Sequence, residues 1–419
     1  MDGFPSRPEL PILAKLYPLP LVSELRGAAW QAAADWQSAH SCPRRRAELV
    51  PEAGRLLRWQ VYRRPHSLTC AALMKWTARS KTLAVNLLDM SGAGLFLRPF
   101  YGGQGAILCL HRVLPDDVPT LQPGIVVRVV QLREALQYAL GHGWDLVSLN
   151  EVPARLAATT RGGRRFLAIT LDDGYLDNMV YGLPLFEEFN APFTIFPVTG
   201  FISRSVTCRP GVVEALLFCS DRIVLEDPSR GAMEYGGRSL EEKAASFSGI
   251  KQVLGQPWLE HSLTSACGAA GLNIAHIMDR RYLSWEQLGV LSRNPLVTIG
   301  VHTVSHAALA TLPADEAARE ISASRQELET RLNIPIRYIA YPYGSPGTCG
   351  DREYRLAREM GFAAGYTTAR GNLHLRHRDA LWSLPRHTLS MVRHSANVRY
   401  VRLSLSGLWD ALPARMSWR

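Results

Sequence analysis

The sequence lacks any run of about 18 apolar residues, the length that a membrane-spanning helix needs. Its first residues, MDGFPSRPELPILAKLYPLPLV, lack the basic start and unbroken apolar core of a signal peptide, because acidic residues come early and prolines interrupt the apolar stretch. The seven cysteines are odd in number and include no Cys-x-x-Cys pair of a zinc or redox centre. These absences predict a cytoplasmic protein with reduced thiols.

Outside the first part of the chain the net charge is small, because acidic residues nearly balance the basic ones. Residues 1–100 contain 14 Lys and Arg against 7 Asp and Glu, so they hold +7 of the total charge of +10. No nucleic-acid partner is expected, because the remaining 319 residues are nearly neutral. We interpret residues 1–100 as a basic extension, partly helical or disordered, which is solvated or makes a weak contact with an anionic surface.

What the sequence does have, from Gly105 onward, is a regular alternation of short apolar runs and helical patterns. This rhythm is typical of parallel strands joined by helices, and it predicts an α/β fold, a deformed (β/α) barrel of 7–8 parallel strands over residues 101–400. A helix-rich insertion is expected at about 200–283, a helix at 313–332 and a C-terminal tail at 401–419. The predicted strands are 105–110, 145–149, 165–171, 193–198, 297–301, 337–341, 362–367 and 381–385.

Two adjacent carboxylates, Asp172 and Asp173, lie in the segment TLDDGY, which follows the apolar strand FLAI directly. Catalytic groups collect at the ends of barrel strands, so one carboxylate there can serve a metal ion and the other a proton transfer. An Asp-Asp-Gly sequence by itself is usually only a turn.

A pair of histidines, His302 and His306, begins where the predicted strand VTIGV ends. On a helical turn, side chains four residues apart face the same way, and two imidazoles so placed can chelate one ion. Together with one carboxylate they make an Asp-His-His set that leaves positions open for water and substrate. A third segment, RYIAYPYG, is a predicted strand that ends in the turn Pro342-Tyr343-Gly344.

In this order, the three segments resemble the polysaccharide deacetylase family, which includes the rhizobial chitooligosaccharide deacetylases, over roughly residues 105–390. In that family the first Asp of the Asp-Asp-Gly motif is the catalytic base, and the second binds metal with both histidines. The resemblance thus implies that Asp172 is the base. It implies that the metal ligands are Asp173, His302 and His306, and that the backbone N–H of Tyr343, after Pro342, helps to stabilise the oxyanion.

Two features depart from the common family pattern. The family's catalytic histidine lies in a Leu-x-Leu-His segment on a late strand, whereas here Leu108-Cys109-Leu110-His111 comes early. One branch of the family is circularly permuted, so the resemblance implies that His111 is the catalytic acid; the alternative is that it only supports the strand. Many members have an arginine where this chain has Ala340, and Arg386 is our candidate to supply the guanidinium that orients the base.

The resemblance therefore implies a metal-dependent hydrolase that removes N-acetyl groups from an oligo- or polysaccharide containing N-acetylglucosamine and releases acetate. One divalent ion is expected. Zinc fits the mixed nitrogen and oxygen ligands best, and cobalt, nickel, iron or manganese fit nearly as well. The alternatives are a barrel metallohydrolase acting on another amide or ester, and a non-catalytic glycan-binding relative; a binding protein would need neither a base nor a cation.

Overall fold

A parallel sheet lies at the centre of the fold, with strand order β12-β1-β5-β6-β9 and with β4 paired to the start of β5. Every residue of β1 and β5 is buried, as expected for strands that are covered on both faces. The six strands are β1 (Gly105–Leu110), β4 (Asp145–Leu146), β5 (Phe166–Asp173), β6 (Phe193–Pro197), β9 (Val297–Ile299) and β12 (His387–Thr388).

Two further strands, β10 (Tyr338–Ala340) and β11 (Ala364–Tyr366), pair with each other in parallel. A parallel bridge from Val301 to Ile339 connects the end of β9 to β10, and another from Tyr366 to Leu384 connects β11 to the residues that lead into β12. The carboxyl ends of all these parallel strands therefore point the same way. The predicted parallel α/β fold is confirmed. The two bridges are the contacts that link β9 to β10, and β11 to the segment before β12, as closure into a barrel requires.

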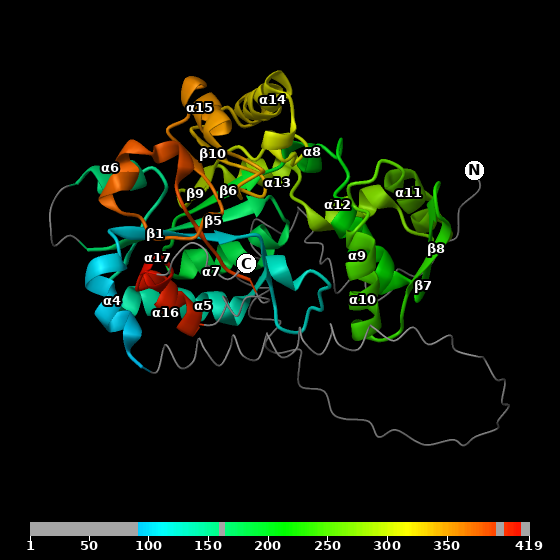
Figure 1. The fold of residues 1–419 in the computed structure, drawn as a ribbon, viewed down its shortest axis with the longest axis horizontal. Helices are drawn as coiled ribbons and strands as arrows, with labels where there is room; N and C mark the ends of the chain where they lie inside the picture. Colours follow the sequence, from blue (N-terminus) through cyan, green and yellow to red (C-terminus); the bar gives the residue numbers. More distant parts are fainter. Residues whose placement is uncertain (1–90, 159–163, 391–397, 412–419) are drawn as a thin grey trace, which may run out of the picture. The chain divides into compact units, whose positions relative to one another are not determined.

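This computed structural model describes residues 91–158, 164–390 and 398–411. Most of the predicted basic extension, including its arginine cluster, lies outside these ranges. Within them, no helix is both long enough and apolar enough to cross a bilayer. In Figure 1, α14 and α15 lie on one side of the sheet and α5 and α16 on the other. The helices are α4 (Ala93–Tyr101), α5 (Val129–Gly141), α6 (Val152–Ala157), α7 (Leu183–Glu188), α8 (Thr199–Ile202), α9 (Arg209–Cys219), α10 (Leu240–Lys251), α11 (Leu259–Ala269), α12 (Ile274–Arg281), α13 (Trp285–Leu291), α14 (Ala314–Leu332), α15 (Asp351–Glu359), α16 (Val398–Leu405) and α17 (Leu408–Ala411).

Most predicted strands and the helix predicted at 313–332 agree with the structure to within a few residues. The strand predicted at 381–385 is wrong, because these residues begin with a 3₁₀ turn, η5 (Leu381–Ser383), and pairing with β1 starts only at His387. Pro385 lies between them and has no N–H to donate to a ladder. The expected C-terminal tail also contains structure, since most of α16 and all of α17 lie within it.

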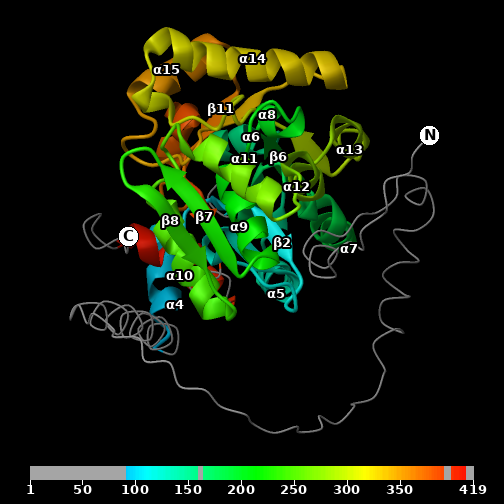
Figure 2. The ribbon, with the colours of Figure 1, turned by 90° about the vertical axis from the view of Figure 1, so that its right-hand side faces the viewer.

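The insertion consists of helices α9–α12 and an antiparallel hairpin of β7 (Arg222–Asp227) and β8 (Gly231–Gly236). Figure 2 shows these elements together on the side of the molecule that faces the viewer. The hairpin was not predicted, because β8 has no buried residue and so lacks the apolar pattern of a strand. Apolar side chains of the insertion share a core with Leu114, Val118 and Leu121, which follow β1 in the chain.

The short elements near the site are β2 (Arg112–Leu114) and β3 (Val126–Arg128), which pair in parallel, and η2 (Asn178–Gly182), a π-helical turn after β5. The remaining 3₁₀ turns are η1 (Pro123–Ile125), η3 (Leu309–Thr311) and η4 (Leu375–Asp379).

Candidate active site

At the end of β5, the two adjacent carboxylates face two different groups of side chains. Successive side chains of a strand point to opposite sides, so Asp172 faces Arg386 and Asp173 faces the two histidines. Asp173 has a left-handed backbone (φ 75°), and the next residue, Gly174, has φ 78°. A Cβ at Gly174 would lie 2.9 Å from Cβ of Pro197, so this tight departure from the strand requires glycine.

Asp173, His302 and His306 form a group whose ligand atoms lie within 4.8 Å of one another. Oδ1 of Asp173 is 3.4 Å from Nε2 of His302 and 3.3 Å from Nε2 of His306. Although this buried oxygen faces both rings, it accepts no hydrogen bond from the described residues. Burial would raise the pKa of Asp173, but the two histidines outweigh it and hold that pKa well below its usual value.

These three residues fit a divalent ion. A tetrahedral ion at roughly 2.0–2.1 Å from nitrogen and oxygen ligands places those ligands about 3.3–3.4 Å apart, the spacing seen at Asp173 Oδ1. Nδ1 of His302 lies 2.8 Å from the carbonyl oxygen of Ala340, and a proton on Nδ1 leaves the lone pair of Nε2 directed at the group.

The loop 302–306 brings the histidines together in a way that differs from the prediction. These residues are not helical, so the expected helical turn is wrong. Instead, Thr303 (φ 65°) and His306 (φ 59°) have left-handed backbones, and the loop turns back so that both Nε2 atoms meet Asp173. Backbone conformations of this kind cost free energy and persist only where surrounding contacts hold them.

Glu320 on α14 supplies those contacts, and the sequence contained no signal for this role. Its Oε2 accepts hydrogen bonds from the backbone N–H groups of Val304 and Ser305, each at 2.9 Å. Its Oε1 accepts from the Ser305 hydroxyl at 2.8 Å. One carboxylate therefore binds the backbone N–H groups of two of the three residues between the histidines.

Asp172 forms a bidentate ion pair with Arg386, and both side chains are almost completely buried. Nη1 of Arg386 donates to Oδ1 at 2.8 Å and Nη2 donates to Oδ2 at 2.7 Å. The guanidinium also donates to the Thr170 hydroxyl and to the Thr367 carbonyl. Burial would raise the pKa of Asp172, but Arg386 and His302 outweigh it and lower that pKa. Arg386 therefore contacts Asp172 from the segment that leads into β12, and not from the strand that contains Ala340.

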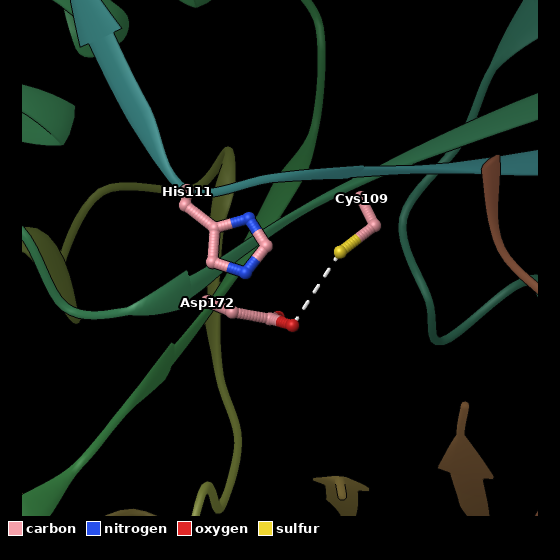
Figure 3. A group of neighbouring side chains, drawn as sticks. All are labelled: Cys109, His111 and Asp172. Carbon is pink, nitrogen blue, oxygen red and sulfur yellow. Dashed lines mark hydrogen bonds between the residues drawn. The ribbon is translucent and has the colours of Figure 1, made fainter. Parts of the chain in front are cut away.

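Cys109, His111 and Asp172 form a second group of possible ligands within 4.8 Å of one another. Figure 3 shows the His111 ring and the Cys109 thiol directed at the Asp172 carboxylate. The thiol donates to Asp172 Oδ2 at 3.4 Å, and burial raises the pKa of Cys109, so the sulfur stays protonated. This group fits a cation poorly, because Asp172 is already neutralised by Arg386 and a thiol that keeps its proton is a weak ligand.

His111 carries an imidazole with unused hydrogen-bonding capacity. Its Nδ1 is buried and has no partner among the described residues. Burial lowers the pKa of His111, and the carboxylates of Asp173 and Asp172 oppose this effect only in part.

The turn Pro342-Tyr343-Gly344 lies beside the Asp-His-His group. The Tyr343 ring meets the edge of the His306 ring with centroids 4.7 Å apart, and Pro342 is buried. Tyr343 has a left-handed backbone (φ 62°), and its carbonyl accepts a hydrogen bond from the Thr368 hydroxyl at 2.6 Å. Its backbone N–H has no acceptor within the described part of the chain.

Residues 159–365 match the family model described as polysaccharide deacetylase. This segment belongs to the polysaccharide deacetylase family. The family predicted from the three motifs is thereby confirmed, although His111 precedes the deacetylase segment and Arg386 follows it. The segment contains the other candidate site residues, which are Asp172, Asp173, His302, His306, Pro342 and Tyr343.

Several solved structures are similar to this chain. The deacetylase PplD of Streptococcus pyogenes has 16% identity and a TM-score of 0.46, covering 72% of this chain and 97% of that one. IcaB from Ammonifex degensii has 17% identity and a TM-score of 0.45, covering 72% and 98%. The BpsB deacetylase domain from Bordetella bronchiseptica has 16% identity and a TM-score of 0.43, covering 68% and 96%. No curated protein matches the chain.

Proposed function

We propose that this protein is a metal-dependent deacetylase that removes N-acetyl groups from N-acetylglucosamine units of an oligo- or polysaccharide and releases acetate. The main support for the proposal is that the two carboxylates at the end of β5 face different groups of side chains. Asp173 faces two imidazoles that suit a cation, while Asp172 is held by Arg386 and has no place in that ligand set. A site of this kind has both a cation position and a separate carboxylate for proton transfer.

Asp173, His302 and His306 would hold the ion. Their mixed oxygen and nitrogen donors favour zinc, with cobalt, nickel, iron or manganese as close alternatives. A bound divalent ion would supply Lewis-acid chemistry that polarises the acetyl carbonyl.

Asp172 acts as the general base. Arg386 keeps its carboxylate ionised and fixed in direction, so that it can accept a proton from the water that attacks the acetyl carbon. The unpartnered N–H of Tyr343 donates to the oxyanion that forms. The C–N bond then breaks, the sugar nitrogen takes a proton from His111, and the products are acetate and a free amine.

His111 reaches this position from an early strand. Because β1 lies between β12 and β5, its end adjoins both the Arg386 segment and the Asp172 strand. This neighbourhood supports a circularly permuted order in which the first strand takes the place of a late one. A cytoplasmic location stays a prediction.

Acetate release from N-acetylglucosamine oligomers of several lengths, after reconstitution with each candidate metal, tests the proposed function. We expect metal-dependent release of one acetate for each amine formed. Hydrolysis of aryl acetates without any release from the oligomers would instead indicate a metallohydrolase acting on another amide or ester. Metal binding without hydrolysis of either substrate would indicate a non-catalytic relative.

His111→Ala is expected to slow amide substrates by about 100-fold, the usual scale for loss of a general acid. Activated aryl acetates should be slowed far less, because their leaving groups need no proton. Initial rates on both substrates, with metal content measured in parallel, check this expectation. Equal slowing of the two substrates would contradict the acid role and favour a His111 that only supports the strand.

A further inference from the structure

The backbone that carries His111 is hydrogen-bonded to the chain that leaves the Asp172 strand. We propose that Asn178, with Asp177 beside it, is a positioning residue that holds His111 in place for proton transfer. The inference rests on the proposed role of His111 as the acid. It concerns two residues that follow the Asp-Asp-Gly motif and have no place in the metal or base chemistry described above.

Three hydrogen bonds join these residues to the segment 111–113. Nδ2 of Asn178 donates to the carbonyl oxygen of His111 at 2.7 Å. Oδ1 of Asp177 accepts from the backbone N–H of Val113 at 3.0 Å, and its Oδ2 accepts from Nε of Arg112 at 2.8 Å. Asn178 is fully buried and Asp177 nearly so, hence water does not compete for these bonds. The segment is therefore held on both sides of Arg112.

Asp177 and Asn178 lie close in sequence to the proposed base. Asp177 and Asn178 follow Asp172 by only five and six residues, and Asn178 opens the π-helical turn η2. Through them, the chain that leaves the strand of the base also holds the segment that carries the acid. Base and acid must lie on either side of one acetyl group, and a misplacement of about 1 Å can cost about 100-fold in rate. A direct connection between their two strands limits such a misplacement.

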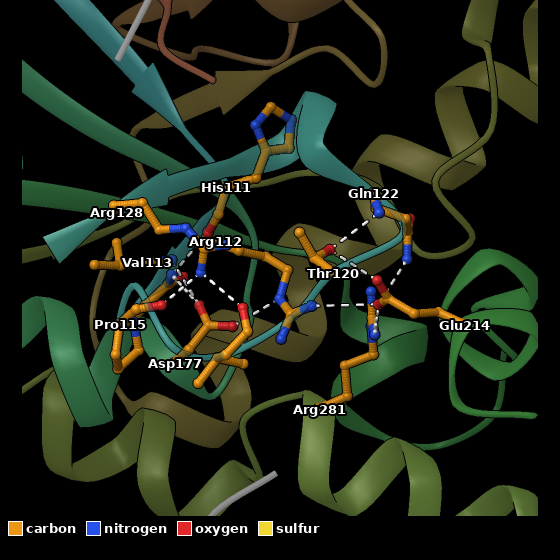
Figure 4. A network of polar contacts seen from close by, with 12 residues as sticks. His111, Arg112, Val113, Pro115, Thr120, Gln122, Arg128, Asp177, Glu214 and Arg281 are labelled. Carbon is orange, nitrogen blue, oxygen red and sulfur yellow. Dashed lines mark hydrogen bonds and ion pairs between the residues drawn. The ribbon is translucent and has the colours of Figure 1, made fainter. Parts of the chain in front are cut away.

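The insertion secures the same segment from its other side. Glu214 on α9 accepts from Nη1 of Arg112 at 3.4 Å and from Nη1 of Arg281 at 2.7 Å. Burial would raise the pKa of Glu214, but Arg281 and Arg112 outweigh it and lower that pKa to about 2, so the carboxylate is ionised at neutral pH. Figure 4 shows Arg112 between Asp177 and Glu214, with the His111 ring pointing away from this network. The carboxylates of Asp177 and Glu214 thus balance the guanidinium groups of Arg112 and Arg281, and the His111 imidazole is not needed for this balance.

A double-mutant cycle between Asn178 and His111 tests the proposal in the full chain. Asn178→Ala should slow release of acetate from N-acetylglucosamine oligomers by about 10- to 100-fold and slow aryl acetates much less. In the His111→Ala background the same substitution should change the amide rate by less than about twofold, because the residue it positions is gone. Metal content should stay at the wild-type level throughout.

Two further variants sharpen the test. Asn178→Asp has the same shape without the amide donor and should behave like Asn178→Ala. As a control, Asn294→Ala removes the side-chain hydrogen bonds to Glu187 and to the Leu296 N–H before the amino end of β9, and it should leave the rate unchanged. If the Asn178 variants fail to fold, Asp177→Asn keeps an oxygen for Val113 and takes their place in the cycle.

The outcomes separate this inference from the proposed function. Equal slowing by Asn178→Ala with and without His111, or wild-type amide activity of Asn178→Asp, would overturn the positioning role alone. Wild-type amide activity of His111→Ala would overturn the acid role, and the inference with it.

Discussion

His302→Ala and His306→Ala are each expected to abolish both stoichiometric binding of a divalent ion and deacetylation. Both imidazoles face the same oxygen of Asp173 at 3.3–3.4 Å, so neither has a substitute within the group. Loss of partners outside the ligand sphere already costs about 10- to 100-fold in metal affinity, and loss of a ligand should cost more. Elemental analysis of purified variants and titration with zinc measure the effect.

The His306 variant gives the clearer result of the two. The side chain of His306 is 20% exposed, whereas His302 is fully buried and its removal also leaves the Ala340 carbonyl without a donor. His142→Ala is a suitable control, because His142 is exposed and stacks on Tyr138 at the end of α5. Full metal content in both site variants, with the fold intact by circular dichroism, would disprove the ligand assignment.

Asp172→Asn is expected to keep near-normal metal content while lowering the deacetylation rate by about 100-fold or more, the usual scale for loss of a general base. The substitution removes a proton acceptor and leaves Asp173, His302 and His306 untouched. It also leaves the buried Arg386 guanidinium without its counter-charge. Removal of one partner of a buried ion pair costs on the order of 3–5 kcal/mol, so the free energy of unfolding should fall as well.

Rates must therefore be compared at a temperature where the Asp172 variant is fully folded. Thermal unfolding monitored by circular dichroism gives that range, and metal content is measured on the same sample. If Asp172→Asn loses the metal as completely as the histidine variants do, the roles of Asp172 and Asp173 have been exchanged.

The sequence by itself determined where most strands lie along the chain and which residues stand at their carboxyl ends. Short apolar runs such as FLAI and VTIG favour strands, and in parallel strands the residues that follow them gather at one edge. Local pattern could therefore place Asp172, Asp173 and His302 at that edge, and the resemblance to the family supplied their roles. The family pattern then added His111, since no local signal separates an acid from a histidine that only supports its strand.

Only the tertiary structure decided how these residues meet. Arg386 lies 214 positions from Asp172, and their bidentate contact depends on the pairing of β12 with β1 and of β1 with β5. The loop 302–306 is non-helical because Glu320, on another element, binds its backbone donors. Such contacts follow from the register and direction of segments far apart in the chain, and hydrophobic periodicity reports only which face of one segment is buried.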